Sequence, residues 1–410
     1  MVECWLPYGK TEIHITVPIQ DLMGILEPRF NQPLEDAPTS LEKAIAEAFE
    51  GEAAEKASGG LAAIAIDGAL NPSLAALASS KVVERLRGGG ASPDSIVLIV
   101  GNGWRRHSDP QLIEALRAQA PLRDLKIYEH TLRAGELTDL GATERGTMVS
   151  INRHFASAQL RIVIGETHPD ALTGFKGPQD VLLPGISSLK TVEMNRIHAL
   201  REVPGPGKVE GNQLLEDVME VAKLADVDLA VNMVSSPEGG LLGVYAGDLE
   251  EVWRRAISDF GEAFRVRVEN RPEILVLSAG GFKHDHDLYS AIWALSPAKD
   301  MADRGFLIIL AAECSEGLGV EGLRTLSKME RVEELRRSYT LGAEAVNLLK
   351  STLRRSQVHI VSALPRSYLE PLGLKPHRTA NEALASAVEG RRGRKTLVIP
   401  RGCITIPELS

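Results

Sequence analysis

The chain has 410 residues, of which 44% are hydrophobic and 25% charged, a composition typical of globular proteins. At this length we expect two domains, because one hydrophobic core rarely grows beyond about 250–300 residues. The net charge of -9 argues against non-specific nucleic-acid binding, which depends on cations that neutralise phosphates. No apolar run approaches the roughly 20 residues that span a bilayer, and no secretory leader is recognisable. The cytoplasm is therefore the expected location.

Short apolar runs alternate with longer amphipathic stretches along the chain. We expect the following runs to form buried strands: Ile64–Ile66, Ile96–Val100, Leu160–Ile164, Leu229–Val234, Ile274–Leu277, Phe306–Leu310 and His359–Val361. Strands that helices cover on both faces read as continuous hydrophobic runs, so this pattern predicts an α/β fold with parallel sheets. Near the N-terminus, Glu12–Val17 alternates polar and apolar residues and predicts an antiparallel edge strand or hairpin.

A domain boundary is predicted just before Arg271-Pro272, where a charged amphipathic stretch ends and a new apolar run begins. We therefore assign residues 1–268 to a larger N-terminal α/β domain and residues 269–384 to a smaller C-terminal α/β domain. A strand within residues 385–410 is expected to return to the first domain, because chain termini often lie close together.

The first candidate site loop, Gly101–Arg106, follows a predicted strand directly. In open α/β sheets, ligands bind beyond the carboxyl ends of the strands. Glycines let backbone N–H groups approach an anion closely, while Arg105 and Arg106 offer forked donors to a carboxylate or phosphate. The loop thus predicts an anion site, although a surface turn with solvated arginines gives the same pattern.

The second loop, Gly165–Ile186, is long and rich in turn-forming residues, which is typical of loops that carry sites. His168 is the candidate acid/base, because a histidine can take or give a proton near neutral pH. Asp180 is the candidate group that orients or charge-balances it. The alternative is that His168 is only a hydrogen-bonded structural residue.

The third loop, Ala279–Tyr289, follows the first strand predicted for the second domain. Asp285 or Asp287 suits the N-cap of a following helix. His284 and His286 are candidate metal ligands, because alternate side chains of an extended segment share one face, but no third ligand is identifiable. We favour the cap.

Taken in order, these segments resemble the nickel-pincer lactate racemase family. The matching stretches are Asp67, Gly101–Arg106, Gly141–Thr147, Gly165–Gly185, Gly280–Tyr289 and Ala311–Gly317. The resemblance implies two α/β domains with a nickel pyridinium dithio-pincer nucleotide between them. It also implies racemisation or epimerisation of α-hydroxy acids, in which a hydride moves to the pincer ring and back.

Several residues that carry the family's chemistry are replaced in this chain. Asp180 stands where the family has its cofactor-anchoring lysine. Arg196 stands where the family has a nickel-binding histidine, with His198 as a shifted candidate ligand. Of the two catalytic histidines of the family, one corresponds to Arg105 and the other to His168. The resemblance therefore implies a lactate-racemase-like scaffold and cleft without the covalent nickel-pincer cofactor.

The residues that we assign to substrate or anion binding are Asp67, Arg106, Arg196, Tyr289, Ser290 and Trp293. In the family's Y-Q-x-x-K segment the tyrosine remains, as Tyr289. Ser290 and Trp293 replace the glutamine and the lysine of that segment.

We predict a racemase- or epimerase-type isomerase that acts on an α-hydroxy acid or sugar acid in the interdomain cleft. His168 is the expected acid/base, and Arg105, Arg106 or Arg196 the expected anion holder. Two alternatives stay open: a non-catalytic ligand-binding paralogue or partner subunit of an active racemase, and a hydrolase or dehydratase using His168 and Asp180. The expected partner is a small anionic substrate or ligand, with no nucleic acid and no membrane; a homo-oligomer is compatible with the sequence.

Overall fold

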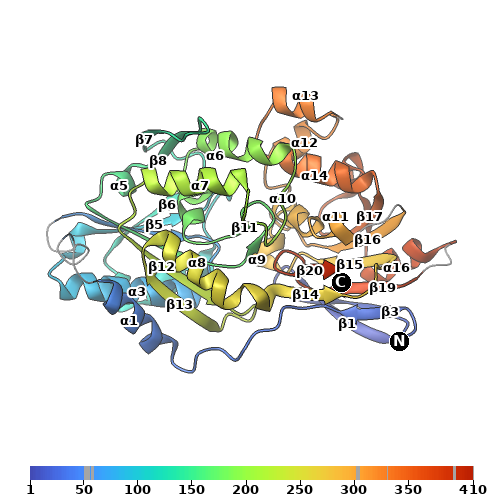
Figure 1. The fold of residues 1–410 in the computed structure, drawn as a ribbon, viewed down its shortest axis with the longest axis horizontal. Helices are drawn as coiled ribbons and strands as arrows, with labels where there is room; N and C mark the ends of the chain where they lie inside the picture. The colour runs from blue at the N-terminus through green and yellow to red at the C-terminus, as the bar shows by residue number, and fades with distance from the viewer. Residues whose placement is uncertain (50–55, 57–59, 302–304, 330, 391–393, 410) are drawn as a thin grey trace.

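The computed structural model describes residues 1–49, 56, 60–301, 305–329, 331–390 and 394–409. The described chain forms two α/β units, each built on a six-stranded sheet, which lie side by side along the long axis of the molecule (Figure 1). The predicted fold class is thereby confirmed. No helix among the described residues is long and apolar enough to cross a membrane.

The first sheet has the strand order β13-β12-β9-β4-β5-β6. Its strands are β4 (Ala62–Asp67), β5 (Ile96–Gly101), β6 (Lys126–His130), β9 (Leu160–Glu166), β12 (Leu229–Ser235) and β13 (Leu241–Gly247). Only the pair β12 and β13 is antiparallel among these neighbours. The four predicted apolar runs of this domain form β4, β5, β9 and β12, because these strands are buried between helices.

Helices cover both faces of the first sheet. One face packs against α1 (Ala37–Ala48), α3 (Pro72–Gly88) and α4 (Pro110–Ala118). The other face packs against α5 (Arg153–Ala156), α6 (Leu189–Arg196), α7 (Gln213–Leu224) and α8 (Leu249–Phe260). Single turns and short ribbons complete the domain: η1 (Pro93–Ser95), η2 (Ala120–Leu122), η3 (Val181–Gly185), η4 (Ile197–Leu200), η5 (Gly261–Phe264), β7 (Leu137–Ala142) with β8 (Met148–Asn152), and β10 (Pro169–Asp170) with β11 (Gly174–Phe175).

The second sheet is parallel throughout, in the order β18-β17-β16-β15-β19-β3. Its strands are β3 (Leu22–Ile25), β15 (Ile274–Ser278), β16 (Phe306–Ala311), β17 (Ser356–Val361), β18 (Lys375–His377) and β19 (Thr396–Ile399). The three remaining predicted runs are confirmed as β15, β16 and β17. The helical segments are α9 (Phe282–Asp285), α10 (Leu288–Ile292), η6 (Trp293–Leu295), α11 (Ala298–Met301), α12 (Gly322–Thr325), α13 (Val332–Arg337), α14 (Ala343–Leu353), α15 (Arg366–Leu369), η7 (Glu370–Leu372) and α16 (Ala380–Val388).

Both ends of the chain pack against the second sheet. The N-terminal strands β1 (Val2–Tyr8) and β2 (Thr11–Val17) form the predicted antiparallel hairpin, and its apolar face packs with α16 on that sheet (Figure 1). Strand β19 pairs with β15 and β3, which differs from our expectation that this segment returns to the first domain. Its apolar side chains complete the buried core of a parallel sheet there. Strand β20 (Ile406–Leu409) instead pairs with β14 (Arg265–Val268), just before the predicted boundary.

Two glycines let strand ends lie directly against the loop of residues 176–185. A Cβ atom on Gly101, at the end of β5, would lie 3.0 Å from the carbonyl carbon of Gly185. A Cβ atom on Gly165, in β9, would lie 2.7 Å from Cα of Pro178. Backbone atoms cannot move aside as a flexible side chain can, so these positions require glycine and fix the loop over the sheet.

We expect Gly165→Ala to lower the free energy of unfolding by about 1–3 kcal/mol, because the added methyl overpacks a backbone contact. Urea unfolding followed by circular dichroism measures this change. Gly135→Ala is the matched control, since a Cβ atom there meets nothing within 4 Å, and its effect should stay within about 0.5 kcal/mol. Equal effects of the two substitutions would contradict the close approach at Gly165.

Candidate functional site between the two sheets

A cavity of about 100 Å³, here called the small cavity, lies where loops of the two domains meet. Its wall includes Asp67, Arg105, His168, Asp170, Lys176, Asp180, Arg196, Lys283, His284, His286, Ser290, Trp293 and Cys403. A second cavity of about 440 Å³, here called the large cavity, shares part of that wall, namely Gly68, Ala69, Arg105, His168, Lys283 and His284. The loops after β4, β5, β9 and β15 contribute to both cavities, so the site lies beyond the carboxyl ends of the strands as expected for α/β sheets.

His168 is a neutral imidazole with a free lone pair. It lies in the short link between β9 and β10 and is 8% exposed, and its Nδ1 donates a hydrogen bond to the carbonyl oxygen of Pro169 at 2.9 Å. Because Nδ1 holds the proton, Nε2 carries the lone pair. Burial, together with the cations Lys283 and Lys176, lowers the pKa of His168 to about 4. At neutral pH this side chain can therefore accept a proton.

Lys176 has the opposite protonation state in the same cavity wall. It directly follows β11, and its backbone N–H donates to the carbonyl oxygen of His168 at 2.9 Å. Its Nζ lies 3.5 Å from Oδ2 of Asp67. Burial opposes the charge, but Asp67 and Asp180 outweigh it and raise the pKa of Lys176. The side chain is therefore an ammonium that can give a proton.

Two carboxyl groups of the small cavity differ in their charge. Burial opposes ionisation of Asp67, but Lys176 outweighs it, so the pKa of Asp67 is lowered and its carboxyl stays ionised. Burial raises the pKa of Asp180 to about 7 despite Lys176, with a further contribution from Asp170. Asp180 Oδ2 accepts a hydrogen bond from the backbone of Gly177 at 3.0 Å. Near neutral pH, Asp180 therefore exchanges between a carboxylate and a neutral acid.

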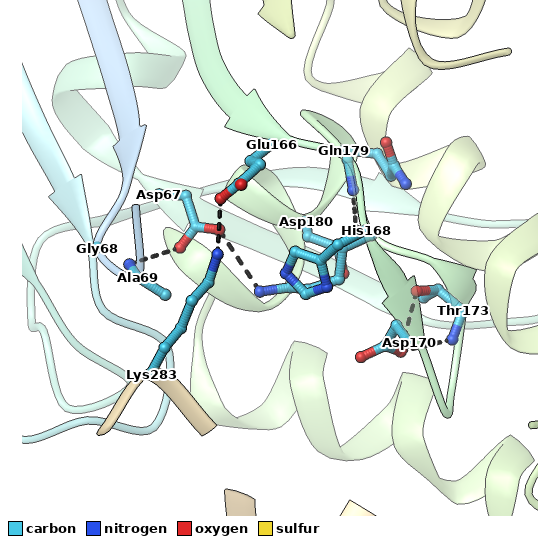
Figure 2. Close-up of polar contacts among 12 residues, drawn as sticks. Asp67, Gly68, Ala69, Glu166, His168, Asp170, Thr173, Gln179, Asp180 and Lys283 are labelled. Atoms are coloured by element: carbon cyan, nitrogen blue, oxygen red, sulfur yellow. Dashed lines mark hydrogen bonds and ion pairs between the residues drawn. The ribbon is translucent and has the colours of Figure 1, made fainter. Parts of the chain in front are cut away.

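Contacts between the domains close the wall of the cavities. Lys283, on α9, reaches across to Glu166 at the end of β9 with a distance of 2.6 Å between Nζ and Oε2 (Figure 2). Burial opposes the charge of Glu166, but Lys283 outweighs it and lowers the pKa of the carboxyl. The ring of His284 meets the ring of His168 edge to face at 5.7 Å. The site therefore depends on both domains.

Arg105 lines both cavities, but its donors are used for contacts between loops. Its Nε lies 3.1 Å from Nε2 of His286, and its Nη1 donates to the carbonyl oxygen of Gly68 at 3.3 Å. The structure thus brings Arg105 to the predicted cleft as a bridge between the domains. Its expected role as a catalytic or anion-binding residue stays a prediction.

The remaining sequence predictions divide between the cavity and other places. Asp67, Asp180, Arg196, Ser290 and Trp293 line the small cavity with His168 and Arg105.

Arg106, Tyr289 and His198 line neither cavity. Arg106 is exposed, because it points out of the loop that turns Arg105 inward. Tyr289 is buried, and its hydroxyl donates to Glu344 at 2.6 Å in the core of the second domain. His198 lies on η4, beyond the end of α6.

The two candidate metal ligands of the third loop have different neighbours. The ring of His284 lies against that of His168. His286 contacts Arg105, and Asp287 caps α10 by accepting a hydrogen bond from the backbone of Ser290 at 2.7 Å. This confirms the capping interpretation of the third loop for Asp287. Within the described residues, no group of three or more His, Cys, Asp or Glu side chains is arranged to hold a metal ion.

A buried polar network fixes the end of α6 and with it Arg196. The side chain of Asn195 donates to Oδ2 of Asp217 at 2.8 Å. The hydroxyls of Thr143 and Thr147 donate to the same carboxylate at 2.5 and 2.8 Å. The stretch Gly141–Thr147, which the resemblance singled out, therefore supports the backbone from which Arg196 projects.

Lys176, Lys283 and Glu166 belong to the site, although we assigned none of them a catalytic or anion-binding role from the sequence; Lys176 was weighed only as a displaced cofactor anchor. Each lies in one of the glycine-rich loops, but their pairings join residues far apart in the chain. Glu166 could have been predicted, because a charged residue at the end of a buried strand needs a partner for its charge.

Fold and cavity together define a two-domain α/β protein with a loop-built site between a mixed sheet and a parallel sheet. Residues 8–204 match the lactate racemase N-terminal domain, and residues 268–406 match the lactate racemase C-terminal domain. The chain belongs to the lactate racemase family.

Individual relatives are distant in sequence. The lactate racemase of Thermoanaerobacterium thermosaccharolyticum is 23% identical over 99% of both chains, and the structure of its apoprotein superimposes with a TM-score of 0.83 over 99% of this chain and all of that one. The lactate racemase of Lactiplantibacillus plantarum is 26% identical over 59% of this chain and 57% of that protein. A Thermotoga maritima protein, 13% identical, superimposes with a TM-score of 0.69 over 93% of this chain and all of that one. At these identities the structural likeness shows the fold alone.

We expect the imidazole of His168 to titrate near pH 4 and Lys283→Met to raise this pKa, because the substitution removes a cation that disfavours protonation. NMR of ¹⁵N-labelled histidine measures both values. The unfolded chain, with a histidine pKa of about 6.5, binds the proton more readily. The stability contributed by neutral His168 is therefore complete above about pH 6.5 and is lost as the pH falls toward 4. A lower pKa in the Lys283→Met variant would contradict this electrostatic account.

Proposed function

We propose that this protein is a racemase- or epimerase-type isomerase of a small 2-hydroxy acid that exchanges the proton on the substrate's α-carbon through His168 and Lys176. The observation that carries the proposal is that a neutral imidazole and an ammonium line one small cavity. Two groups whose pKa values are pushed apart by their surroundings form an acid/base pair at neutral pH.

Inversion at the α-carbon by proton transfer needs a base to remove one proton and an acid to supply another. His168 Nε2 accepts the α-proton, and the electron pair of the broken C–H bond moves into the carboxylate. A new C–H bond then forms with a proton from the Lys176 ammonium, which leaves His168 protonated and Lys176 neutral. His168 then releases its proton to solvent and Lys176 takes one up, as their pKa values favour, which restores the starting state. The opposite enantiomer reacts by the same steps in reverse.

Negative charge develops on the substrate carboxylate during proton removal and must be stabilised. The wall of the small cavity contributes the cations Arg105, Lys176, Arg196 and Lys283. Cations held in a largely buried site stabilise such charge more than they would in water, because they need no reorganisation. This cationic wall supports an anionic transition state.

The residues of the cavity do not fit the covalent nickel-pincer group that the resemblance implies. Asp180, at the anchor position, has no amine with which to form a thioamide. Arg196, at the nickel-ligand position, is a guanidinium cation without a lone pair for a metal. Lys176 is held as an ammonium beside Asp67, which disfavours its use as a substitute anchor. The proposed reaction therefore uses proton transfer by the chain's own residues.

The proposal is tested by incubating the purified protein with enantiopure lactate, glycerate or gluconate in D₂O. We expect inverted product that carries deuterium at the α-carbon, measured by NMR and chiral chromatography. His168→Gln and Lys176→Gln should each lower the rate by about 100-fold or more, because each removes one acid/base group. His107→Ala is the control, since this exposed histidine lines neither cavity.

Two outcomes would overturn the proposal. Inverted product without solvent deuterium would indicate internal hydride transfer, as in the pincer chemistry of the resemblance. Binding of these acids without any inversion or exchange would favour the non-catalytic ligand-binding alternative. Circular dichroism of each variant establishes that a lost rate is not a lost fold.

A further inference from the structure

We propose that Arg196 is the carboxylate-binding residue of the small cavity, so that a hydroxy-carboxylate ligand lies with its carboxylate at the end of α6 and its remaining chain toward the large cavity. This inference deepens the proposed function, on which its substrate class rests. The binding itself is measurable without turnover.

The guanidinium of Arg196 is buried without a hydrogen-bond acceptor. Arg196 is 4% exposed and lines the small cavity, and its Nε and Nη1 have no hydrogen-bond partner in the described part of the chain. Leaving a buried charged donor unsatisfied is costly, and native proteins rarely do so without a functional reason. A bound anion would supply the missing acceptors.

The other cations of the small cavity already have partners. Lys176 pairs with Asp67, and Lys283 pairs with Glu166. Arg105 donates to His286 and to a backbone carbonyl. Among the cations that line the small cavity in the described chain, Arg196 therefore has the unused hydrogen-bonding capacity.

The carboxyl groups near Arg196 are compatible with an anion bound to its guanidinium. Asp170 lies close enough for Arg196 to help lower the pKa of its carboxyl against the effect of burial, yet no hydrogen bond joins the two side chains. Asp180 has a pKa of about 7, raised by burial. In its neutral form Asp180 can donate a hydrogen bond to a ligand oxygen, and so it need not repel an anion held by Arg196.

A guanidinium suits a carboxylate better than it suits a metal. Its planar array of N–H donors matches the two oxygens of a carboxylate, and it has no lone pair with which to coordinate nickel. Where the family has a side chain that binds nickel, Arg196 is therefore a side chain that binds an organic anion.

The arrangement of the two cavities sets the orientation of the ligand. Arg196 lines the small cavity but not the large one, whereas His168 lies in the wall that both share. A carboxylate at Arg196 directs the α-carbon toward His168 and the rest of the chain toward the large cavity. Polar side chains line that cavity, among them Asn71, Gln111 and Ser235. A polyhydroxy chain matches this lining better than an apolar one does.

Isothermal titration calorimetry of the purified protein tests the inference with lactate, gluconate, uncharged lactamide and inorganic phosphate as probes. We expect both carboxylates to bind and lactamide to bind at least about 10-fold more weakly. Arg196→Gln should weaken carboxylate binding by about 10- to 100-fold, the usual effect of losing a hydrogen bond to a charged group. The carboxylate affinity of Arg196→Lys should lie between those of the wild type and Arg196→Gln, because lysine keeps the charge but loses the planar donors.

Arg201→Gln is the matched control, since this exposed arginine just beyond η4 lines neither cavity, and it should bind like the wild type. Thermal unfolding of all variants shows whether each one folds. Wild-type affinity in Arg196→Gln, equal binding of lactamide, no carboxylate binding at all, or tighter binding of phosphate than of carboxylates would each overturn the inference. Carboxylate binding through Arg196 without deuterium exchange would instead overturn the proposed function alone.

Discussion

The ion pair between Glu166 and Lys283 is the contact on which the site depends. It joins the end of β9 in the first domain to α9 in the second, over 2.6 Å and with Glu166 buried. A buried carboxylate without its cation would be strongly destabilising, so the pair holds the two loops together. Burial and the nearby Lys283 lower the pKa of His168, whereas Glu166 acts in the opposite direction. Lys283 therefore takes part both in the contact between the domains and in keeping the imidazole neutral.

The charges around the small cavity alternate, and this alternation produces the acid/base pattern. Asp67 keeps the buried Lys176 protonated, while burial, together with Lys283 and Lys176, keeps His168 neutral. Burial raises the pKa of Asp180 and the nearby Lys176 lowers it, and the result is a pKa of about 7. No single residue type explains these states, because each depends on the charge of its neighbours.

The sequence predicts the parts of this structure that depend on local pattern. Buried apolar runs became the central strands, and His168 and Asp180 reached the cavity because they lie in a loop that follows one of those strands. Side-chain direction within a loop is set by distant contacts, so the sequence did not separate Arg106, which is exposed, from Arg105. The pairing of Glu166 with Lys283 spans 117 residues and leaves no local signal. The position of β19 in the second sheet was not predicted for a similar reason, because the strands with which it pairs lie far away in the chain.

Asp180 and Arg196 are electrostatically related. The carboxyl of Asp180 and the guanidinium of Arg196 face the same small cavity, and Arg196 favours the charged form of Asp180. A lysine at position 180 would place a further cation beside Lys176 and Arg196 in a space of about 100 Å³, where like charges raise the free energy of the folded state. A lysine at position 180 is thus less favourable beside the Arg196 guanidinium than the carboxyl of Asp180 is. Meanwhile the network around Asp217 fixes the end of α6 through Asn195, whichever side chain follows it. The backbone position of Arg196 is therefore set by its neighbour Asn195 rather than by the chemistry of its own side chain.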